Sequence, residues 1–510
     1  MTRLLIRDCT LDGKDGCSVY CDGGRVEMIV DGEIQPFPDD TEVIDARGGS
    51  LYPGLVDSHC HPFALGQLKR SVDLRGTTNI TGLRLRLLSG VQRVKPGEWV
   101  TGMGWDHEAY PGGAMPSKED IDDITPKNPV ALSRVCGHVA LLNSRAIEGL
   151  GLMERRGREY ERGASGELTG IVKEQALEEV YRRVPRSADR FVADLQSVEA
   201  EAARFGLTTL HCILSPEGYR EELGALAALE AASSLSLRYR VYIPPDAIEF
   251  VEAERIREKL SGERVRINGV KLYADGSLGA RTAALREPYA DDPTNSGLLR
   301  QKDEELTELV GRVDALGYQV IIHAIGDRAV EQAVDALAKV TGSTNPRRHR
   351  IEHASLLPRD LRSKMVKHSI RATVQPLFIT SDTWALDRLG EERVSDLYPL
   401  RSMLSEGLVA SGGSDCPVES MSPILGMWAA MTRGGSNLEE SLSLEEALSL
   451  YTSNSLSNGF DDFMTRGVGS PASFTLLDSD TTAMHPALFR KVGVLATVVD
   501  GVVVHSYGQG

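Results

Sequence analysis

The sequence predicts an α/β protein: a (β/α)8 TIM barrel with a large insert after its first strand, plus a small β-sandwich domain built from both chain ends. Short apolar runs alternate with amphipathic stretches through the middle of the chain, and both ends are rich in β-type segments. Apolar runs bounded by turns indicate strands, and three- and four-residue spacing indicates helices. The predicted barrel strands are 51–58, 206–214, 238–243, 266–273, 318–323, 349–353, 370–375 and 408–413.

Amphipathic stretches at 188–205 and 302–316 supply two of the helices that must connect these strands. Eight parallel strands joined by crossover helices close into a barrel, whose active site lies at the C-terminal ends of the strands. The side chains that end the predicted strands are therefore the first candidates for function.

The two ends of the chain have a different pattern. Residues 1–50 hold short β-like pieces separated by Asp-Gly and Gly-Gly turns, and Asp500-Gly501 divides two apolar runs as a tight hairpin would. We expect one composite β-sandwich domain from 1–50 and 466–510, with a barrel domain over 51–465 between them.

The interval 64–190 is too long for a single βα unit. Removing it from 51–465 leaves a remainder close to the typical barrel length of about 250 residues. An insert after the first strand would stand over the catalytic face, so we expect a lid or specificity subdomain. A peripheral decoration is the alternative.

Composition restricts the expected partners. The formal net charge of -16 argues against nucleic acid or an anionic membrane surface, because both require clustered Lys and Arg. Seven scattered cysteines, and no apolar stretch of about 18 to 20 residues, predict a cytoplasmic protein without a membrane segment. A small molecule is the expected substrate.

Four histidines converge at one end of the predicted barrel. His59 and His61 end the first strand in GLVDSHCHPF, His323 ends the fifth strand, and His353 ends the sixth. Alternation along the first strand turns Cys60 away from its two neighbours. Each histidine alone is more often a core or rim residue than a ligand. Their joint placement indicates a metal centre, since neutral imidazole is a common ligand of zinc-like ions.

An aspartate and a lysine join this set. Asp415 follows the eighth strand after the small-residue run in ASGGSDCPVE, and Lys271 lies among apolar neighbours on the fourth strand. Burial disfavours the charged form of a lysine and makes its amine nucleophilic. Lys271 is therefore a candidate for chemical modification.

Five segments carry a resemblance to a known family: PGLVDSHCHPF, GVKLYADGSLGARTA, IHAIGDRAVE, RIEHAS and GSDCPVE. They resemble the signature segments of the amidohydrolase superfamily, in particular its metal-dependent family 3 branch, which includes N-substituted formamide deformylases. GWDHEAYP and CGHVALLNSRAIEGLG resemble the same branch. The resemblance covers nearly the whole chain, and the β-rich ends are similar to the family's composite β-sandwich.

The resemblance implies a hydrolase with one or two divalent ions, expected to be zinc. The first two histidines and Asp415 would hold the more buried ion, and the other two histidines the second ion. Lys271, as a carbamate formed with carbon dioxide, would bridge both. Metal-bound hydroxide would attack a carbonyl, and Asp415 would act as general base and then acid. The implied ligands are His59, His61, Lys271, His323, His353 and Asp415.

Two features of this ligand set stay open at the sequence level. Glu174, in GIVKEQA, is an alternative bridging group in place of Lys271, and the site could hold one ion instead of two. The implied reaction is hydrolysis of an amide-like C–N bond other than a peptide bond.

Substrate contacts are expected at Trp105, Asp106 and His138 in the insert and at Arg281 after the fourth strand. A structural tryptophan and a capping aspartate are the alternatives for the first two. Asp327 is expected to orient a ligand histidine, as sites of this kind require.

Other functions use the same residues. A phosphotriesterase- or lactonase-like hydrolase would need the same metals, and a non-enzymatic regulator could be built on this fold. A (β/α)8 isomerase or aldolase would form a Schiff base at Lys271. We also expect a homodimer, because such enzymes commonly associate.

Overall fold

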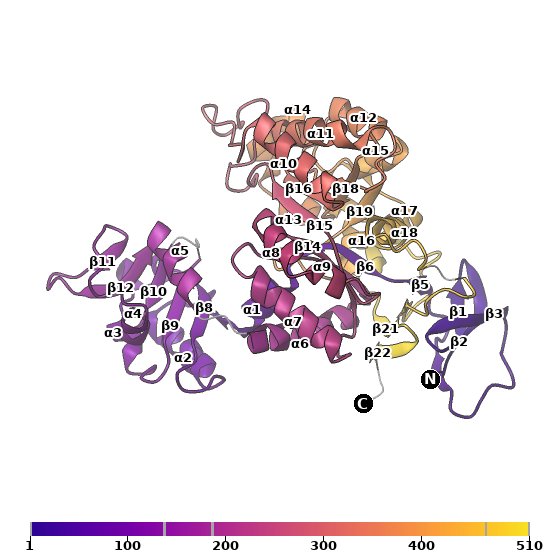
Figure 1. Ribbon diagram of the computed structural model, residues 1–510, viewed down its shortest axis with the longest axis horizontal. Helices are drawn as coiled ribbons and strands as arrows, with labels where there is room; N and C mark the ends of the chain where they lie inside the picture. Colours follow the sequence, from indigo (N-terminus) through magenta and orange to yellow (C-terminus); the bar gives the residue numbers. More distant parts are fainter. Residues whose placement is uncertain (1–2, 136–138, 185–187, 465–466, 508–510) are drawn as a thin grey trace. The chain divides into compact units, whose positions relative to one another are not determined.

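The computed structural model describes residues 3–135, 139–184, 188–464 and 467–507 (Figure 1). The chain forms two compact units. One contains residues 1–63 and 195–510, and the other contains residues 64–194. Each unit is described by itself below.

Eight parallel strands form the central sheet of the first unit, in the order β19-β18-β17-β16-β15-β14-β13-β6. Backbone hydrogen bonds join the two ends of this order. The Asp415 N–H donates to the His59 carbonyl at 2.7 Å, and the His61 N–H donates to the Cys416 carbonyl at 2.9 Å. The predicted (β/α)8 barrel is thus confirmed. Its strands are β6 (Val56–Cys60), β13 (Thr209–Ile213), β14 (Arg238–Ile243), β15 (Val265–Tyr273), β16 (Gln319–Ala324), β17 (Arg350–His353), β18 (Arg371–Val374) and β19 (Ala410–Gly412).

Helices connect the strands, and several of them bury an apolar stripe. In α10 (Asp303–Ala315), for example, the buried residues Leu306, Val310 and Val313 recur at helical spacing. The two helices predicted at 188–205 and 302–316 correspond to α6 and α10. The helices of this part of the chain are α6 (Ala188–Arg204), α7 (Tyr219–Ala231), η3 (Pro245–Ala247), α8 (Ile248–Ala253), α9 (Ile256–Lys259), α10, α11 (Asp327–Thr341), α12 (Arg359–Lys367), α13 (Phe378–Ser381), α14 (Ala385–Val394), α15 (Leu400–Ser405), α16 (Pro423–Thr432), η4 (Arg433–Gly435), η5 (Leu438–Glu440), α17 (Leu444–Tyr451), α18 (Ser453–Asn458) and α19 (Pro486–Phe489).

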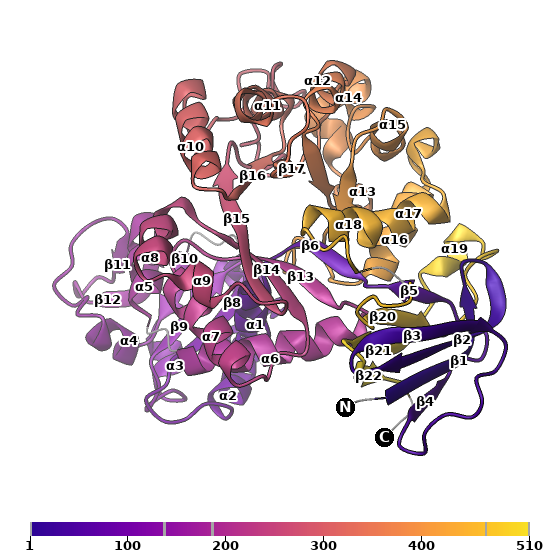
Figure 2. The same cartoon turned by 45° about the vertical axis from the view of Figure 1, so that its right-hand side comes forward.

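Two four-stranded sheets from the chain ends pack together as the predicted β-sandwich (Figure 2). Their orders are β3-β2-β1-β4 and β22-β21-β20-β5. Ile6 and Val19 from one sheet share a buried core with Phe474 and Val498 from the other. The strands are β1 (Arg3–Leu11), β2 (Lys14–Asp22), β3 (Arg25–Asp31), β4 (Glu42–Asp45), β5 (Leu51–Pro53), β20 (Phe474–Leu477), β21 (Val494–Val499) and β22 (Val502–Ser506).

The single strand predicted at 51–58 is two strands in different sheets. β5 pairs with β20 of the sandwich, whereas β6 belongs to the barrel. Between them Gly54 has a φ of 83°, a left-handed conformation that glycine adopts without a steric penalty. The apolar run conceals this break, because residues in both strands are buried.

The unit formed by residues 64–194 has its own mixed six-stranded sheet, in the order β11-β12-β10-β9-β8-β7. Leu83, Leu87, Trp105 and Leu132 belong to its buried core. Its elements are β7 (Val72–Asp73), α2 (Ile80–Val91), β8 (Val100–Trp105), η1 (His107–Ala109), η2 (Pro111–Gly113), α3 (Glu119–Asp122), β9 (Val130–Arg134), β10 (Val139–Leu142), α4 (Ser144–Gly149), β11 (Tyr160–Arg162), β12 (Leu168–Lys173) and α5 (Glu174–Arg183). The chain enters it through α1 (Pro62–Arg70) and leaves through α6. Among the residues described, no helix has the length and apolar character of a membrane span.

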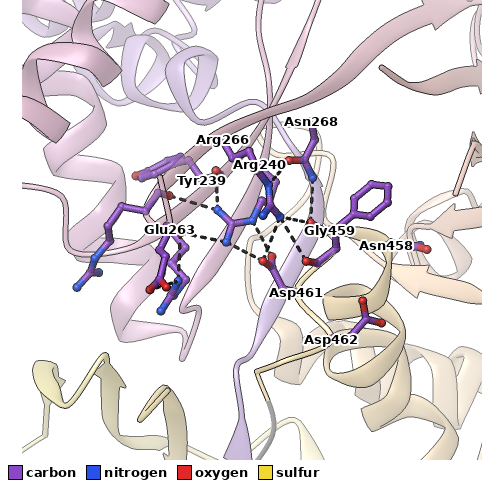
Figure 3. A network of polar contacts seen from close by, with 12 residues as sticks. Tyr239, Arg240, Glu263, Arg266, Asn268, Asn458, Gly459, Asp461 and Asp462 are labelled. Atoms are coloured by element: carbon purple, nitrogen blue, oxygen red, sulfur yellow. Dashed lines mark hydrogen bonds and ion pairs between the residues drawn. The ribbon is translucent and has the colours of Figure 1, made fainter. Parts of the chain in front are cut away.

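A buried carboxylate joins two barrel strands to the segment after α18 (Figure 3). Asp461 is fully buried and forms ion pairs with Arg240 of β14 at 2.6 Å and with Arg266 of β15 at 3.2 Å. Arg240 is fully buried as well. Arg266 and Asn268 also donate hydrogen bonds to the Gly459 carbonyl, at 2.6 and 3.0 Å. Asp461 therefore compensates a guanidinium charge inside the protein.

We expect Asp461→Ala to lower the free energy of unfolding by about 3–5 kcal/mol, because it leaves a buried arginine without its counter-charge. Urea unfolding followed by circular dichroism measures the change. The neighbouring Asp462 is the control: it is 54% exposed and pairs with Arg348, so Asp462→Ala should cost about 0–1 kcal/mol. Equal losses in the two variants would contradict this interpretation of the buried pair.

Candidate metal centre

Three side chains suited to one metal ion meet where β6 and β19 end. His59 lies in β6, His61 directly follows it, and Asp415 comes three residues after β19. The Asp415 Oδ1 atom lies 3.2 Å from the Nε2 atom of each histidine, and the three potential ligand atoms are within 4.8 Å of one another. Burial alone would raise the pKa of Asp415, but the nearby imidazoles, His59 first, hold this pKa well below its usual range.

The local sequence explains this approach. Alternation along β6 sends His59 and His61 to the same side. A Cβ atom on Gly413 would lie 2.7 Å from the backbone nitrogen of His59, so only glycine allows the segment after β19 to come this close. Asp415 itself has a φ of 55°, which turns its side chain at the end of the strand.

A second pair of imidazoles lies beside the first. The ring centroids of His323, on β16, and His353, on β17, are 4.5 Å apart, and the His353 centroid is 4.8 Å from that of His59. His323 donates from Nε2 to the Gly276 carbonyl at 2.9 Å, because a carbonyl oxygen only accepts. Burial lowers the pKa of His323 to about 3, so the ring is neutral and its Nδ1 atom can bind a metal ion.

Gln375 fixes the ring of His353. The Nδ1 atom of His353 lies 2.7 Å from the Gln375 Oε1 atom, which leaves Nε2 for a metal ion. The pKa of His353 is lowered well below its usual value, mainly by burial and then by His323. A neutral imidazole held by one hydrogen bond is the usual state of a metal-binding histidine.

Lys271 lies on β15 and is buried, and its Nζ atom has no hydrogen-bond partner among the described residues. Burial lowers its pKa to about 8. The Nε2 atom of His59 also lacks a hydrogen bond of acceptable geometry, although Asp415 is close. Buried polar atoms without partners are costly, so this donor set fits a divalent cation bound between these groups. The side chain of Glu174 lies outside the part that the structure describes.

Glu352 is a functional candidate that the sequence analysis missed. It is fully buried on β17, contacts the Nδ1 atom of His59, and accepts a hydrogen bond from the Arg350 Nε atom at 2.6 Å. Burial alone would raise the pKa of this carboxyl, but Arg350 and then His59 hold it well below the usual range. The carboxylate therefore fixes His59 with its Nε2 atom toward Asp415. Charged residues inside a short buried strand, as in RIEH, were the available signal.

Two further buried carboxylates lie beside the clustered side chains. Asp57 accepts the backbone N–H of His59 at 3.1 Å and the backbone N–H of Ser414 at 3.0 Å. Asp275 accepts backbone N–H groups, including that of Gly326 at 2.9 Å, and its Oδ1 atom lies 3.4 Å from the His323 Nε2 atom. The sequence analysis assigned neither residue a role.

The predicted substrate contacts of the insert lie within the unit 64–194. Trp105 is fully buried there, and its Nε1 atom donates to the Leu132 carbonyl at 2.7 Å. Asp106 accepts from Arg134 at 2.7 Å and caps η1. His138 lies outside the described residues. The core position of Trp105 and the capping role of Asp106 correspond to the structural alternatives considered for them.

The two predicted supporting residues have other partners in the structure. Arg281 forms an ion pair with Asp291 at 2.9 Å. Asp327 begins α11 and accepts the backbone N–H groups of Arg286 and Arg328 at 2.9 and 3.0 Å. The carboxylate beside His323 in this structure is Asp275.

Comparison with known proteins gives the family. A model of the amidohydrolase family matches residues 42–505. The chain belongs to the amidohydrolase family. It is 31% identical over 485 residues to the Bacillus subtilis protein YtcJ, covering 91% of each chain, and 27% identical over 528 residues to an N-substituted formamide deformylase of Arthrobacter pascens, covering 97% and 96%.

The solved structure of a metal-dependent hydrolase from Pyrococcus furiosus matches this amidohydrolase with a TM-score of 0.79 and 31% identity, over 95% of this chain and 100% of the other. Together with the clustered ligands, these relationships confirm the predicted family. They identify the chain as a metal-dependent hydrolase that uses a divalent ion.

We expect Glu352→Gln to weaken metal binding by about 10- to 100-fold, because a carboxylate that orients a ligand histidine is lost. Competition with a chromophoric chelator measures the affinity. Glu199→Gln is the matched control and should leave the metal affinity unchanged. Glu199 is also buried, but it accepts the backbone N–H groups of Ser236 and Leu237. An unchanged affinity in a folded Glu352→Gln protein would remove Glu352 from the centre.

Proposed function

We propose that this amidohydrolase hydrolyses an amide-like C–N bond, other than a peptide bond, in a small molecule. The observation that supports it most directly is the His59, His61 and Asp415 cluster, whose ligand atoms lie within 4.8 Å of one another at the end of the barrel strands. The Arthrobacter relative is named for removal of a formyl group from N-substituted formamides, which is a reaction of this class.

We further propose that the centre holds zinc. His59, His61 and Asp415 would hold one ion, and His323 and His353 would hold a second. A bound zinc ion lowers the pKa of a water ligand and polarises a carbonyl oxygen. His323 and His353 contribute as neutral rings, and Glu352 and Gln375 orient His59 and His353.

Asp415 is the proposed general base and acid. Its low pKa keeps it ionised near neutral pH, so it can accept a proton from the attacking water. It would then deliver that proton to the nitrogen of the departing amine as the C–N bond breaks. Its side chain is 15% exposed, which leaves it accessible to a substrate at the barrel mouth.

Lys271 is the proposed bridging group, after its neutral amine has attacked carbon dioxide and released a proton to give a carbamate. The support for this is its buried Nζ atom, which has no partner among the described residues. Glu174 stays the alternative. Several points stay predictions: that the metal is zinc, that the protein is cytoplasmic, and that it forms a homodimer. The same holds for the lid role of 64–190, the orienting role of Asp327, and substrate contacts at Trp105, Asp106, His138 and Arg281.

We expect Asp415→Asn to lower kcat on the best amide substrate by about 10²- to 10⁴-fold, because proton transfer is lost. Zinc content is measured in parallel to separate this effect from loss of metal. Asp462→Asn, at a surface ion pair, should leave kcat unchanged.

The reaction class is tested with a panel of amides, esters, lactones and phosphotriesters. Each compound is assayed with the metal-free and with the zinc-loaded protein. Preference for esters, lactones or phosphotriesters would favour the phosphotriesterase- or lactonase-like alternative. Absence of metal in the purified protein, with no turnover of any compound after loading, would favour a non-enzymatic regulator.

We expect Lys271→Ala to lose one of two bound metal equivalents, measured by elemental analysis, while Glu174→Ala retains both. Lys271→Glu supplies a carboxylate near the same position and should recover part of the lost metal. Full retention of two equivalents by Lys271→Ala would count against a lysine bridge.

A further inference from the structure

Arg300 is a charged side chain near the centre that forms no ion pair with a carboxylate of the described residues. It lies in the connection between β15 and α10 and is exposed. Its Nε atom donates to the Asp275 carbonyl at 3.1 Å, and its backbone N–H donates to the Ala274 carbonyl at 2.8 Å. Within the described residues, its two terminal nitrogens have no hydrogen bond or ion pair. The backbone that follows β15 therefore positions a guanidinium group with two free donor nitrogens.

Tyr273 connects Arg300 to the metal centre. It ends β15 two residues after Lys271, and strand alternation places both on one side. The Tyr273 ring centroid lies 5.2 Å from the Arg300 Cζ atom, 5.1 Å from the Lys271 Nζ atom and 5.6 Å from the His323 ring centroid. A cation near an aromatic ring is attracted to it, which favours this position of Arg300. A single side chain thus separates Arg300 from two proposed metal-binding residues.

No carboxylate of the described residues forms an ion pair with Arg300. The Asp275 carboxylate is near enough to interact with its charge, but it accepts hydrogen bonds from the backbone N–H groups of Gly326 and Ile325. Glu217 acts electrostatically on Tyr273 but lies beyond ion-pair distance of Arg300. Arg281, in the same connection, is by contrast paired with Asp291, which also binds Arg388. Arg300 is therefore better placed than Arg281 to receive an anion.

We propose that Arg300 binds a carboxylate of the substrate, so that the substrates of this enzyme are amides with a carboxylate near the scissile bond. This inference rests on the proposed amide hydrolysis. A guanidinium group can bind a carboxylate through two parallel hydrogen bonds, which fixes the orientation of the substrate as well as its affinity. Arg300 is a specificity-determining residue in this scheme and has no part in bond cleavage.

Turnover of matched substrates by the zinc-loaded enzyme tests the proposal. The probes are N-formyl derivatives with one to three methylene groups between the nitrogen and a carboxylate, each compared with its neutral carboxamide. We expect Arg300→Ala to raise KM for the best carboxylate by about 10- to 100-fold. We expect kcat to stay within about twofold, kcat/KM for the carboxamide to stay unchanged, and Arg300→Lys to recover part of the loss.

Arg312→Ala is the control, because this exposed arginine lies in the last turn of α10, at the opposite end of the helix from Arg300. Binding of the corresponding N-methylsulfonyl carboxylates, which cannot be hydrolysed as amides, is measured by calorimetry. The proposal is supported if the carboxylate binds more tightly than the carboxamide and if this difference in affinity disappears in Arg300→Ala.

Two outcomes would overturn it, and they are distinguishable. Equal binding and turnover of carboxylate and carboxamide, with no effect of Arg300→Ala, would remove the role of Arg300 while amide hydrolysis stands. If no amide of the panel is turned over, even where carboxylates bind through Arg300, the proposed amide hydrolysis is wrong. The substrate class assigned here then fails with it.

Discussion

The closure of the barrel between β6 and the segment after β19 is the contact on which the metal centre depends. The Asp415 N–H reaches the His59 carbonyl, and the His61 N–H reaches the Cys416 carbonyl. The same two hydrogen bonds that remove the edges of the sheet therefore bring the three potential ligands together. Gly413 permits this approach, since any Cβ atom there would clash with His59. The fold and the site consequently share one structural requirement.

Burying this many polar groups requires that they compensate one another. Glu352 lies between His59 and Arg350, and Arg350 donates in turn to the hydroxyl of Tyr242 at 2.8 Å. A carboxylate or a guanidinium alone in this interior would carry a large desolvation penalty, whereas Glu352 and Arg350 compensate each other. The network also connects the proposed ligand His59 to strands β14 and β17, so the orientation of the imidazole depends on packing deep in the barrel.

The sequence predicted most of the fold because each barrel strand is an apolar run bounded by turn residues. It also singled out four histidines that the structure brings close together, since His59, His61, His323 and His353 lie at the ends of barrel strands. It failed where a residue's role depends on a distant partner. Nothing next to Glu352 in the chain indicates that its partner is His59. The division of 51–58 into β5 and β6 was missed for a similar reason, because apolar residues suit either sheet.

Arginines give a second example of this limit. Arg281 and Arg300 lie in the same connection, and the sequence offers no means of deciding which one is free. The difference lies in their partners: Asp291 pairs with Arg281 at 2.9 Å, whereas Arg300 has no ion pair in the described part of the chain. Free charge at a site is thus a property of pairing in three dimensions. Residue type alone does not determine it.

The position of the insert is compatible with a fixed metal centre. β6 and β13 are adjacent parallel strands, with Val56 opposite Thr209, although the whole unit 64–194 lies between them in the chain. The cost of closing a loop rises slowly with its length, and a segment with its own buried core pays most of its ordering cost internally. Residues in the insert can therefore change without moving His59 or His61, which the ladder with β13 and the contact with Asp415 hold in place.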